Sequence, residues 1–400
     1  MSASDLSTVR PASGGATDAL RRSNLATVLG LVHRDGDLSR SDLTRLTGLN
    51  RSTVGDLVAE LTGLGLVEVD EAPGGGRAGR PSPVVRVAGN IAAVAVNPEV
   101  DAVIVGLVGL GGRVLKRIRI ETASARSASE TVTLAAAGIA GMLAGESDVR
   151  VIGIGVAVPG QVRLSDGMVR EATHFGWVDE PLAAMLAERT GLQVWAANAA
   201  VLGLRAESAF GAGRGIDDLV YLIGGASGIG GGAVGGGRLL TGAAGYAGEF
   251  GHTFVRSDGR QCSCGARGCL EAEVTQAELL RSVGLPSADA ASLGSRLVAT
   301  EDPAALAVLE RDYALLQVAV RNAVNAFNPT TVVLGGFLAA VYRGARAHGA
   351  PDLLSAVVHS SREGVAVVEA QLGPDQLLIG AAEVVFAELI ADPAAVLAAA

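Results

Sequence analysis

The stretch HTFVRSDGRQCSCGARGC at 252–269 holds all three cysteines of this 400-residue chain, with a histidine at its start. Three thiolates and an imidazole are the ligand set of a tetrahedral Cys3His zinc site. The glycines within the stretch allow the tight turns that His252, Cys262, Cys264 and Cys269 need to converge. Four protein ligands would leave no open position for an activated water, so the sequence predicts a structural Zn²⁺. Buried free thiols are the alternative.

Two carboxylates flank this stretch. Glu249 stands before it in GYAGEFGH, and Glu271 follows it in GCLEAE. A metal-fixed loop would bring both carboxylates toward one place. The alternative is that each is an ordinary surface glutamate, which is the commoner case for a single residue of this type.

Length and composition favour several α/β domains. Four hundred residues exceed what one hydrophobic core normally supports, so we expect two or three domains. Hydrophobic residues make up 49% of the chain and aromatic residues only 3%, so the core must be built from small aliphatic side chains in close-packed layers. We find no signal peptide and no apolar run of the roughly 18–20 residues that a membrane helix needs. We therefore expect a cytoplasmic protein without a membrane partner.

The charge is unevenly divided. Residues 1–90 contain ten arginines and ten acidic residues, whereas the remainder contains 22 basic and 31 acidic residues and carries the whole net charge of −9. An acidic body is a poor partner for a polyanion. We therefore expect any nucleic-acid contact to come from the front segment.

The front segment has the pattern of a winged helix-turn-helix. Residues 1–16 are small and polar and are predicted to form a disordered arm. An apolar stripe from Leu20 to Val32 predicts a first helix. Ser39 and Asp42 form a capping pattern for a short second helix that ends at Gly48, and Asn50 can cap a third helix. Two short strands should follow around a glycine-rich loop.

The third helix and the loop carry the candidate DNA contacts. The helix opens on small or bidentate donors, which suit a major groove and a phosphate at a helix N-terminus. The loop carries arginines and the tripeptide GRP at 79–81, which suits a narrow minor groove. The predicted DNA-binding residues are Asn50, Arg51, Ser52, Thr53, Arg77 and Arg80. A three-helix bundle that merely packs on the body is the alternative.

Motifs along nearly the whole chain resemble those of the ROK family of repressors, open reading frames and kinases, which includes the repressors of xylose and N-acetylglucosamine operons. The motifs are GRP at 79–81, GIGVAVPGQV at 153–162, FGWVDEPL at 175–182, FGAGRG at 210–215, SGIGGGAV at 227–234, GEFGH at 248–252, CSCGARGCLE at 262–271 and NPTTVVLGG at 328–336. The resemblance implies an actin-like (ribonuclease H-like) sugar-kinase body of two α/β lobes around a cleft. In that cleft Glu249, His252 and Glu271 would bind sugar hydroxyls.

The chain departs from the family at two places that matter for phosphoryl transfer. Where the kinases have the phosphate loop D-x-G-G-T, this chain reads NPEVD from Asn97 to Asp101, in which proline removes a donor and two acids would repel a triphosphate. Where the kinases have N-D-A-N, whose aspartate is the general base, Asn198 takes the first position and Ala199 the second. The remnant of the second phosphate loop, from Ser227, is interpreted as structural packing. We therefore predict no catalytic residues.

The sugar site is also altered, because His174 stands where the family usually has asparagine before LGW. It either donates to the ligand or is a satisfied loop histidine. The predicted ligand-binding residues are His174, Asn198, Glu249, His252 and Glu271.

These observations predict three parts: an arm at 1–16, a winged helix-turn-helix at 17–89 and a ROK domain at 90–400. Lobe 1 is expected at about 90–200 with a C-terminal helix at about 380–400, and lobe 2, with the zinc loop, at about 201–379. The predicted function is a DNA-binding transcriptional repressor that responds to a sugar or sugar derivative. It would bind double-stranded operator DNA as a homodimer or homotetramer. The alternatives are an ATP-dependent ROK sugar kinase with an added DNA-binding domain, and a ligand-insensitive DNA-binding protein whose body only oligomerises.

Overall fold

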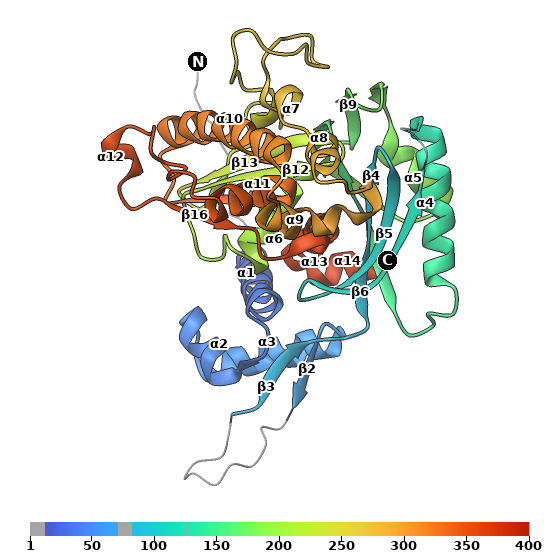
Figure 1. Ribbon diagram of the computed structural model, residues 1–400. Coiled ribbons are helices and arrows are strands. Elements are labelled where there is room, and N and C mark those ends of the chain that lie inside the picture. The colour runs from blue at the N-terminus through green and yellow to red at the C-terminus, as the bar shows by residue number, and fades with distance from the viewer. Residues whose placement is uncertain (1–12, 71–81, 123, 125, 400) are drawn as a thin grey trace, which may run out of the picture. The chain divides into compact units, whose positions relative to one another are not determined.

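The computed structural model in Figure 1 describes residues 13–70, 82–122, 124 and 126–399. Contacts between Cα atoms divide the chain into two compact units. The N-terminal unit comprises Met1–Ile91 together with Phe386–Ala400, and the body comprises Ala92–Val385. Among the described helices, none combines the length and apolar character that crossing a membrane requires.

The N-terminal unit is a winged helix-turn-helix, as the sequence predicts. Its three strands form an antiparallel sheet in the order β1-β3-β2. Its elements in chain order are α1 (Ser13–Asp35), β1 (Leu38–Ser39), α2 (Arg40–Thr47), α3 (Arg51–Gly63), β2 (Val67–Asp70) and β3 (Val84–Val87). The loop between β2 and β3 lies outside the described residues. The unit is completed by the end of α13 (Gln376–Ala391) and by α14 (Pro393–Ala399), and the ring of Phe386 packs on that of His33 with centroids 5.5 Å apart.

Local capping explains where α2 and α3 begin. The Ser39 side chain accepts from the backbone N–H of Asp42 while the Asp42 side chain accepts from that of Ser39, so the predicted capping box is confirmed. Asn50 caps α3 by accepting from the backbone N–H of Thr53. Gly48 ends α2 with a φ of 70°, which glycine adopts without steric cost.

Two expectations for α1 need correction. The helix begins at Ser13, so residues 13–16, which we assigned to the arm, are helical. Their sequence contains no apolar side chain large enough to mark a buried face, so periodicity gave no signal there. Leu20 is 63% exposed, whereas Leu25, Val28 and Val32 are buried. The buried stripe therefore begins one and a half turns later than predicted.

The first lobe of the body is a five-stranded sheet in the order β11-β7-β4-β5-β6. The strands are β4 (Ile91–Glu99), β5 (Ala102–Gly109), β6 (Arg113–Glu121), β7 (Arg150–Val158) and β11 (Val194–Asn198). Helices α4 (Ala128–Leu143) and α5 (Leu182–Thr190) supply the apolar side chains that pack on one face. A smaller sheet follows β7 and contains β8 (Gln161–Arg163), β9 (Met168–Ala172) and β10 (Trp177–Glu180).

The second lobe repeats the architecture with the order β14-β13-β12-β15-β16. Its strands are β12 (Leu219–Gly225), β13 (Gly228–Gly235), β14 (Arg238–Leu239), β15 (Thr331–Gly335) and β16 (Ala366–Glu369). Its helical segments are η1 (Phe250–His252), α7 (Leu270–Glu273), α8 (Gln276–Ser282), η2 (Ser287–Ser292), α9 (Leu293–Ala299), α10 (Pro303–Phe327), α11 (Gly336–Ala347), α12 (His359–Arg362) and η3 (Gly373–Asp375). The two α/β lobes confirm the predicted fold class.

Strand β12 shows how both faces of the second sheet are covered. Val220 and Leu222 face the large core formed with α10 and α11, whereas Leu219 and Tyr221 alternate to the other face, which Leu204 of α6 (Ala199–Phe210) covers. The buried hydroxyl of Tyr221 donates to Oε1 of Gln376 at 2.7 Å. This bond ties the start of α13 to the sheet and satisfies a polar group that would be costly to bury alone.

Candidate functional site

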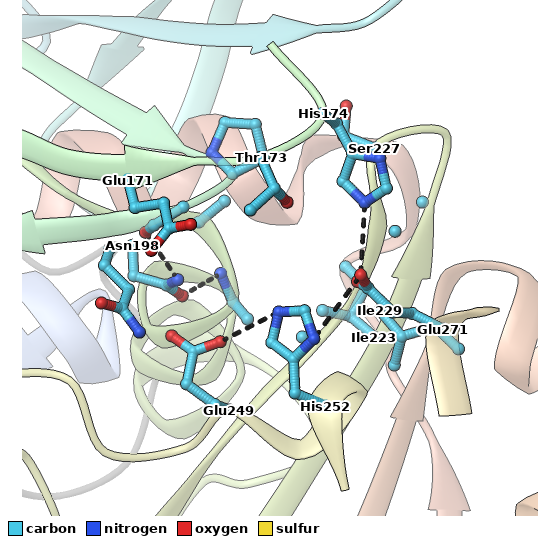
Figure 2. A pocket seen from close by; sticks show the side chains of 18 of the residues that line it. Glu171, Thr173, His174, Asn198, Ile223, Ser227, Ile229, Glu249, His252 and Glu271 are labelled. Carbon is cyan, nitrogen blue, oxygen red and sulfur yellow. Dashed lines mark hydrogen bonds and ion pairs between the residues drawn. The ribbon is translucent and has the colours of Figure 1, made fainter. Parts of the chain in front are cut away.

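A pocket lies in the body at the seam between its two lobes (Figure 2). The first lobe contributes the end of β7, the loop between β9 and β10, and the start of α6. The second lobe contributes the turn between β12 and β13, η1 and α7. The lining residues are Glu99, Pro159, Gly160, Gln161, Glu171, Thr173, His174, Asn198, Ala199, Ala200, Ile223, Gly225, Ser227, Gly228, Ile229, Gly230, Glu249, His252, Cys264, Glu271 and Leu377. All five predicted ligand-binding residues are therefore brought together here.

Carboxylates and imidazoles alternate across this pocket, as the dashed lines in Figure 2 show. Nε2 of His252 lies 3.9 Å from Oε2 of Glu249, and Nδ1 of His252 lies 3.6 Å from Oε1 of Glu271. The same Glu271 oxygen lies 3.4 Å from Nε2 of His174. Since His174 belongs to the first lobe and Glu271 to the second, the last contact joins the lobes.

Burial and partners move the pKa values of these groups in different directions. Burial raises the pKa of Glu249 above its usual range. Burial acts the same way on Glu271, but the hydrogen bond from His174 and the two neighbouring imidazoles outweigh it and lower its pKa. The hydrogen bond with Glu271 in turn raises the pKa of His174. The surroundings therefore favour the ionised form of Glu271 and disfavour that of Glu249.

The start of α6 carries the position where a general base is expected. Asn198 caps the helix, since its Oδ1 accepts from the backbone N–H groups of Ala200 and Val201 at 2.9 and 3.1 Å. Its Nδ2 donates to the Gly160 carbonyl at 2.9 Å. The next residue, Ala199, lines the pocket with a methyl group that cannot accept a proton.

The segment that stands in place of the phosphate loop, Asn97–Asp101, forms the end of β4 and the turn that leads into β5. Its Glu99 carboxylate accepts from Ser227 Oγ at 2.6 Å and from Asn97 Nδ2 at 3.2 Å. The backbone N–H of Val100 donates to the same Ser227 hydroxyl at 3.1 Å. Burial raises the pKa of Glu99. The Ser227 side chain thus bonds across the lobes, whereas the sequence suggested only a packing role for it.

The four predicted metal ligands converge. One donor atom from each of His252, Cys262, Cys264 and Cys269 lies within 4.8 Å of the other three. The three cysteines form no disulfide, and Cys262 and Cys269 are buried. The backbone permits this because Gly268 has a φ of 75° and a Cβ there would lie 1.8 Å from the Arg256 carbonyl oxygen. The cluster could hold a metal ion.

The DNA face proposed from the sequence is partly described. Arg51 and Ser52 are exposed at the start of α3, and Thr53 is half-buried. The Oδ1 of Asn50 is occupied by capping and by a bond from Ser52 Oγ at 2.7 Å, so only its amide nitrogen is left for a base or phosphate. Arg77 and Arg80 lie outside the described residues.

Sequence reasoning missed several pocket residues. Glu171 and Thr173 precede His174 on the same hairpin and line the pocket, but no motif marked them. Glu99 was noted only as a repulsive group. Ser263 is not a lining residue, but it was also not noted although its hydroxyl bonds two lining residues, Thr173 at 3.1 Å and Glu271 at 3.3 Å. The alternation of side chains between the two faces of β9 was the only available signal for Glu171. This alternation does not reveal which of the two faces borders a cavity.

The fold and the site define a two-lobed sugar-kinase-type body in a chain that also carries a winged helix-turn-helix. Residues 94–388 match the sequence profile of the ROK family, and residues 26–78 match that of the MarR family. The chain belongs to the ROK family.

Relatives include both regulators and enzymes. The chain is 29% identical to the xylose repressor of Caldicellulosiruptor bescii, covering 79% of this chain and 83% of that protein. It is 36% identical to the glucokinase of Thermotoga maritima, covering 58% of this chain and 77% of that protein. A crystal structure of a ROK family transcriptional regulator, a homologue of the E. coli MLC protein, has the same fold with a TM-score of 0.74 and 22% identity, covering 96% of this chain and all of that one. A ROK family glucokinase from Streptomyces griseus, in complex with glucose and AMPPNP, is 26% identical with a TM-score of 0.61, covering 73% of this chain and 98% of that one.

Proposed function

We propose that this protein is a DNA-binding transcriptional repressor whose ROK body binds a sugar or sugar derivative without phosphorylating it. The observation that carries the proposal is Ala199, which lines the sugar pocket at the position of the general base. A polar pocket that lacks the general base, in a chain that also carries a winged helix-turn-helix, is suited to binding a sugar as a signal and not to phosphorylating it. The xylose repressors among its relatives support this reading.

Two contacts across the pocket suggest how occupancy is sensed. The Glu99 and Ser227 pair and the His174 and Glu271 pair both join the lobes at the pocket wall. A ligand that bonds these groups would favour one arrangement of the lobes over another. A ligand shifts only the equilibrium between states that it binds differently, so this difference is the signal. The protein would act in the cytoplasm on pseudo-palindromic operators as a homodimer or homotetramer.

We further propose that the Cys3His cluster holds a structural Zn²⁺. The donor set suits Zn²⁺, and four protein ligands would complete its shell. The ion would fix the loop in which Cys264 lines the pocket. It would thereby also position the lining residues His252, which precedes this loop, and Glu271, which follows it.

The function is tested by selecting genomic fragments that bind the purified protein and measuring operator affinity by fluorescence anisotropy with and without sugars. We expect a binding sugar to change operator affinity by about fivefold or more. In thermal unfolding, a true effector at 100 times its Kd adds about 2.7 kcal/mol of stability. An operator affinity that no sugar changes would support the ligand-insensitive alternative instead.

The kinase alternative rests on the identity with glucokinases. A coupled assay of sugar-dependent ADP release distinguishes the two, and we expect no release above background. The Ala199→Asp variant should also stay inactive, because Glu99 still stands in the phosphate turn. Sugar-dependent ADP release by the unaltered protein would overturn the proposal.

A further inference from the structure

The pocket has an unusual charge balance. Four carboxylates line it, from Glu99, Glu171, Glu249 and Glu271, and no lysine or arginine is among its described lining residues. The lining imidazoles belong to His174 and His252, and a His252 that ligates Zn²⁺ is neutral, so among the described lining residues His174 is left as the group that can carry positive charge. If Zn²⁺ occupies the Cys3His cluster, three thiolates and one divalent ion leave a net charge of −1 beside the pocket. The metal therefore offsets none of this negative charge.

The side chains of the pocket wall also offer many hydrogen-bond acceptors, because four of them are carboxylates. Carboxylates only accept hydrogen bonds when ionised, and two of the side-chain donors in the wall are already engaged. Ser227 donates to Glu99, and one N–H of the Asn198 amide donates to the Gly160 carbonyl. The four lining carboxylates therefore favour a ligand that brings hydrogen-bond donors.

Glu99 is the lining carboxylate that two neighbouring side chains hold in a defined position. The hydroxyl of Ser227 and the amide of Asn97 hold its carboxylate in place. A phosphate group beside Glu99 would be repelled by its ionised carboxylate, because no lysine or arginine is among the described lining residues, and like charges in a partly buried site repel strongly. An ammonium group there would gain a charge-assisted hydrogen bond.

A bare metal ion is a poorer fit for these carboxylates. Among the described residues, the only group of His, Cys, Asp and Glu side chains close enough to share an ion is the Cys3His cluster. The four carboxylates are spread around the cavity, as the labelled residues in Figure 2 illustrate for three of them. A ligand of several atoms, with donors at several points, matches this spacing.

From these observations we infer that the pocket takes an unphosphorylated sugar with a protonated amino group, and that Glu99 is a specificity-determining residue that favours the amine and rejects phosphate. This inference rests on the proposed function, because it names the chemical class of the effector.

The test uses matched sugar pairs, so that it does not depend on the stereochemistry of the sugar. Glucosamine and glucose, galactosamine and galactose, and mannosamine and mannose are titrated into the full-length protein by calorimetry, together with glucosamine 6-phosphate and glucose 6-phosphate. We expect the amino sugar of the best-binding pair to bind at least about tenfold more tightly than its neutral partner. We expect neither phosphosugar to bind.

Variants assign the selectivity to the residues named. Glu99→Gln should reduce the preference for the amino sugar about threefold to tenfold, and Glu171→Gln, at the exposed rim, should reduce it less. Glu188→Gln makes the same change on the exposed face of α5 and should leave the preference unaltered. Unfolding curves of the ligand-free variants show whether each is folded.

The possible failures are distinguishable. Neutral sugars that bind as tightly as their amino partners, or a phosphosugar that binds best, would overturn this inference and leave the sugar-responsive repressor intact. An unchanged preference in Glu99→Gln would remove Glu99 as the determinant. If no sugar of any kind binds, the proposed function itself fails.

Discussion

The Cα of Gly228 lies so close to Glu271 that a Cβ at this position would be 2.7 Å from Oε2 of Glu271 and 3.0 Å from Nε2 of His174. Gly228 also has a φ of 112°, a region that other residues rarely adopt. The carboxylate and imidazole that join the two lobes therefore need a position without a side chain at the start of β13.

Gly228→Ala should accordingly disrupt the pocket. We expect sugar affinity to fall at least tenfold and stability to fall by about 1–3 kcal/mol, from backbone strain and displacement of Glu271. Calorimetric titration and urea unfolding measure the two effects. Gly141→Ala in α4 is the control, because a Cβ there meets nothing within 4 Å and alanine favours a helix. Full sugar affinity in Gly228→Ala would contradict this prediction, because it would show that Glu271 and His174 can make room for the added methyl group.

Cys264→Ser should reduce metal content and sugar response together, because it removes one of four ligands from a loop that borders the pocket. Elemental analysis should find about one zinc per chain in the unaltered protein and much less in the variant. Ser257→Ala, an exposed change in the same loop, should keep the metal. Unchanged sugar affinity in a metal-free variant would show that the metal does not organise the pocket.

Arg51→Ala should weaken operator binding by about 1–3 kcal/mol and relax base preference at one position of each half-site. The reason is its exposed place at the start of α3, where a guanidinium can bond a guanine edge. Competition between operator variants in an anisotropy assay checks both effects. Arg189→Ala, an equally charged change on the exposed surface of the body, should have little effect.

Asp312 should make stability depend on pH. It is fully buried in α10, where Oδ1 accepts from Arg311 at 2.6 Å and Oδ2 has no hydrogen-bond partner. Burial raises its pKa to about 6 from 3.8 despite the arginine. Between these two values the folded chain holds a proton that the unfolded chain has lost, so stability falls as pH rises through this window.

Urea unfolding at pH 5 and pH 7.5 checks this expectation. The loss of stability over this range should be smaller in Asp312→Asn by about 1–2 kcal/mol. Hydrogen bonds with Arg311 and Arg260 lower the pKa of Glu278 from 4.5 to about 2. The contribution of Glu278 to stability therefore changes only below pH 4.5 and does not interfere with this measurement. Asp289→Asn, an exposed change, should retain the full dependence. Equal pH slopes in all three proteins would contradict the assignment.

Much of this protein could be predicted from short-range patterns. The capping box of Ser39 and Asp42 and the Asn50 cap depend on residues three positions apart, so local sequence determines them. The Cys3His cluster likewise spans a single loop. Ala199 could be assigned because a family motif has a fixed register from one protein to another.

The composition of the pocket depends instead on residues that are far apart in the chain. Ser227 and Glu99 are separated by 128 positions, and Thr173 and Ser263 by 90. Neither spacing nor periodicity relates such residues, because their approach follows from how two separately wound sheets pack against α6. Helix caps and the metal-ligand cluster are determined by residues close together in the sequence. The charge and hydrogen-bonding groups of the cavity depend instead on which surfaces the folded chain brings into contact.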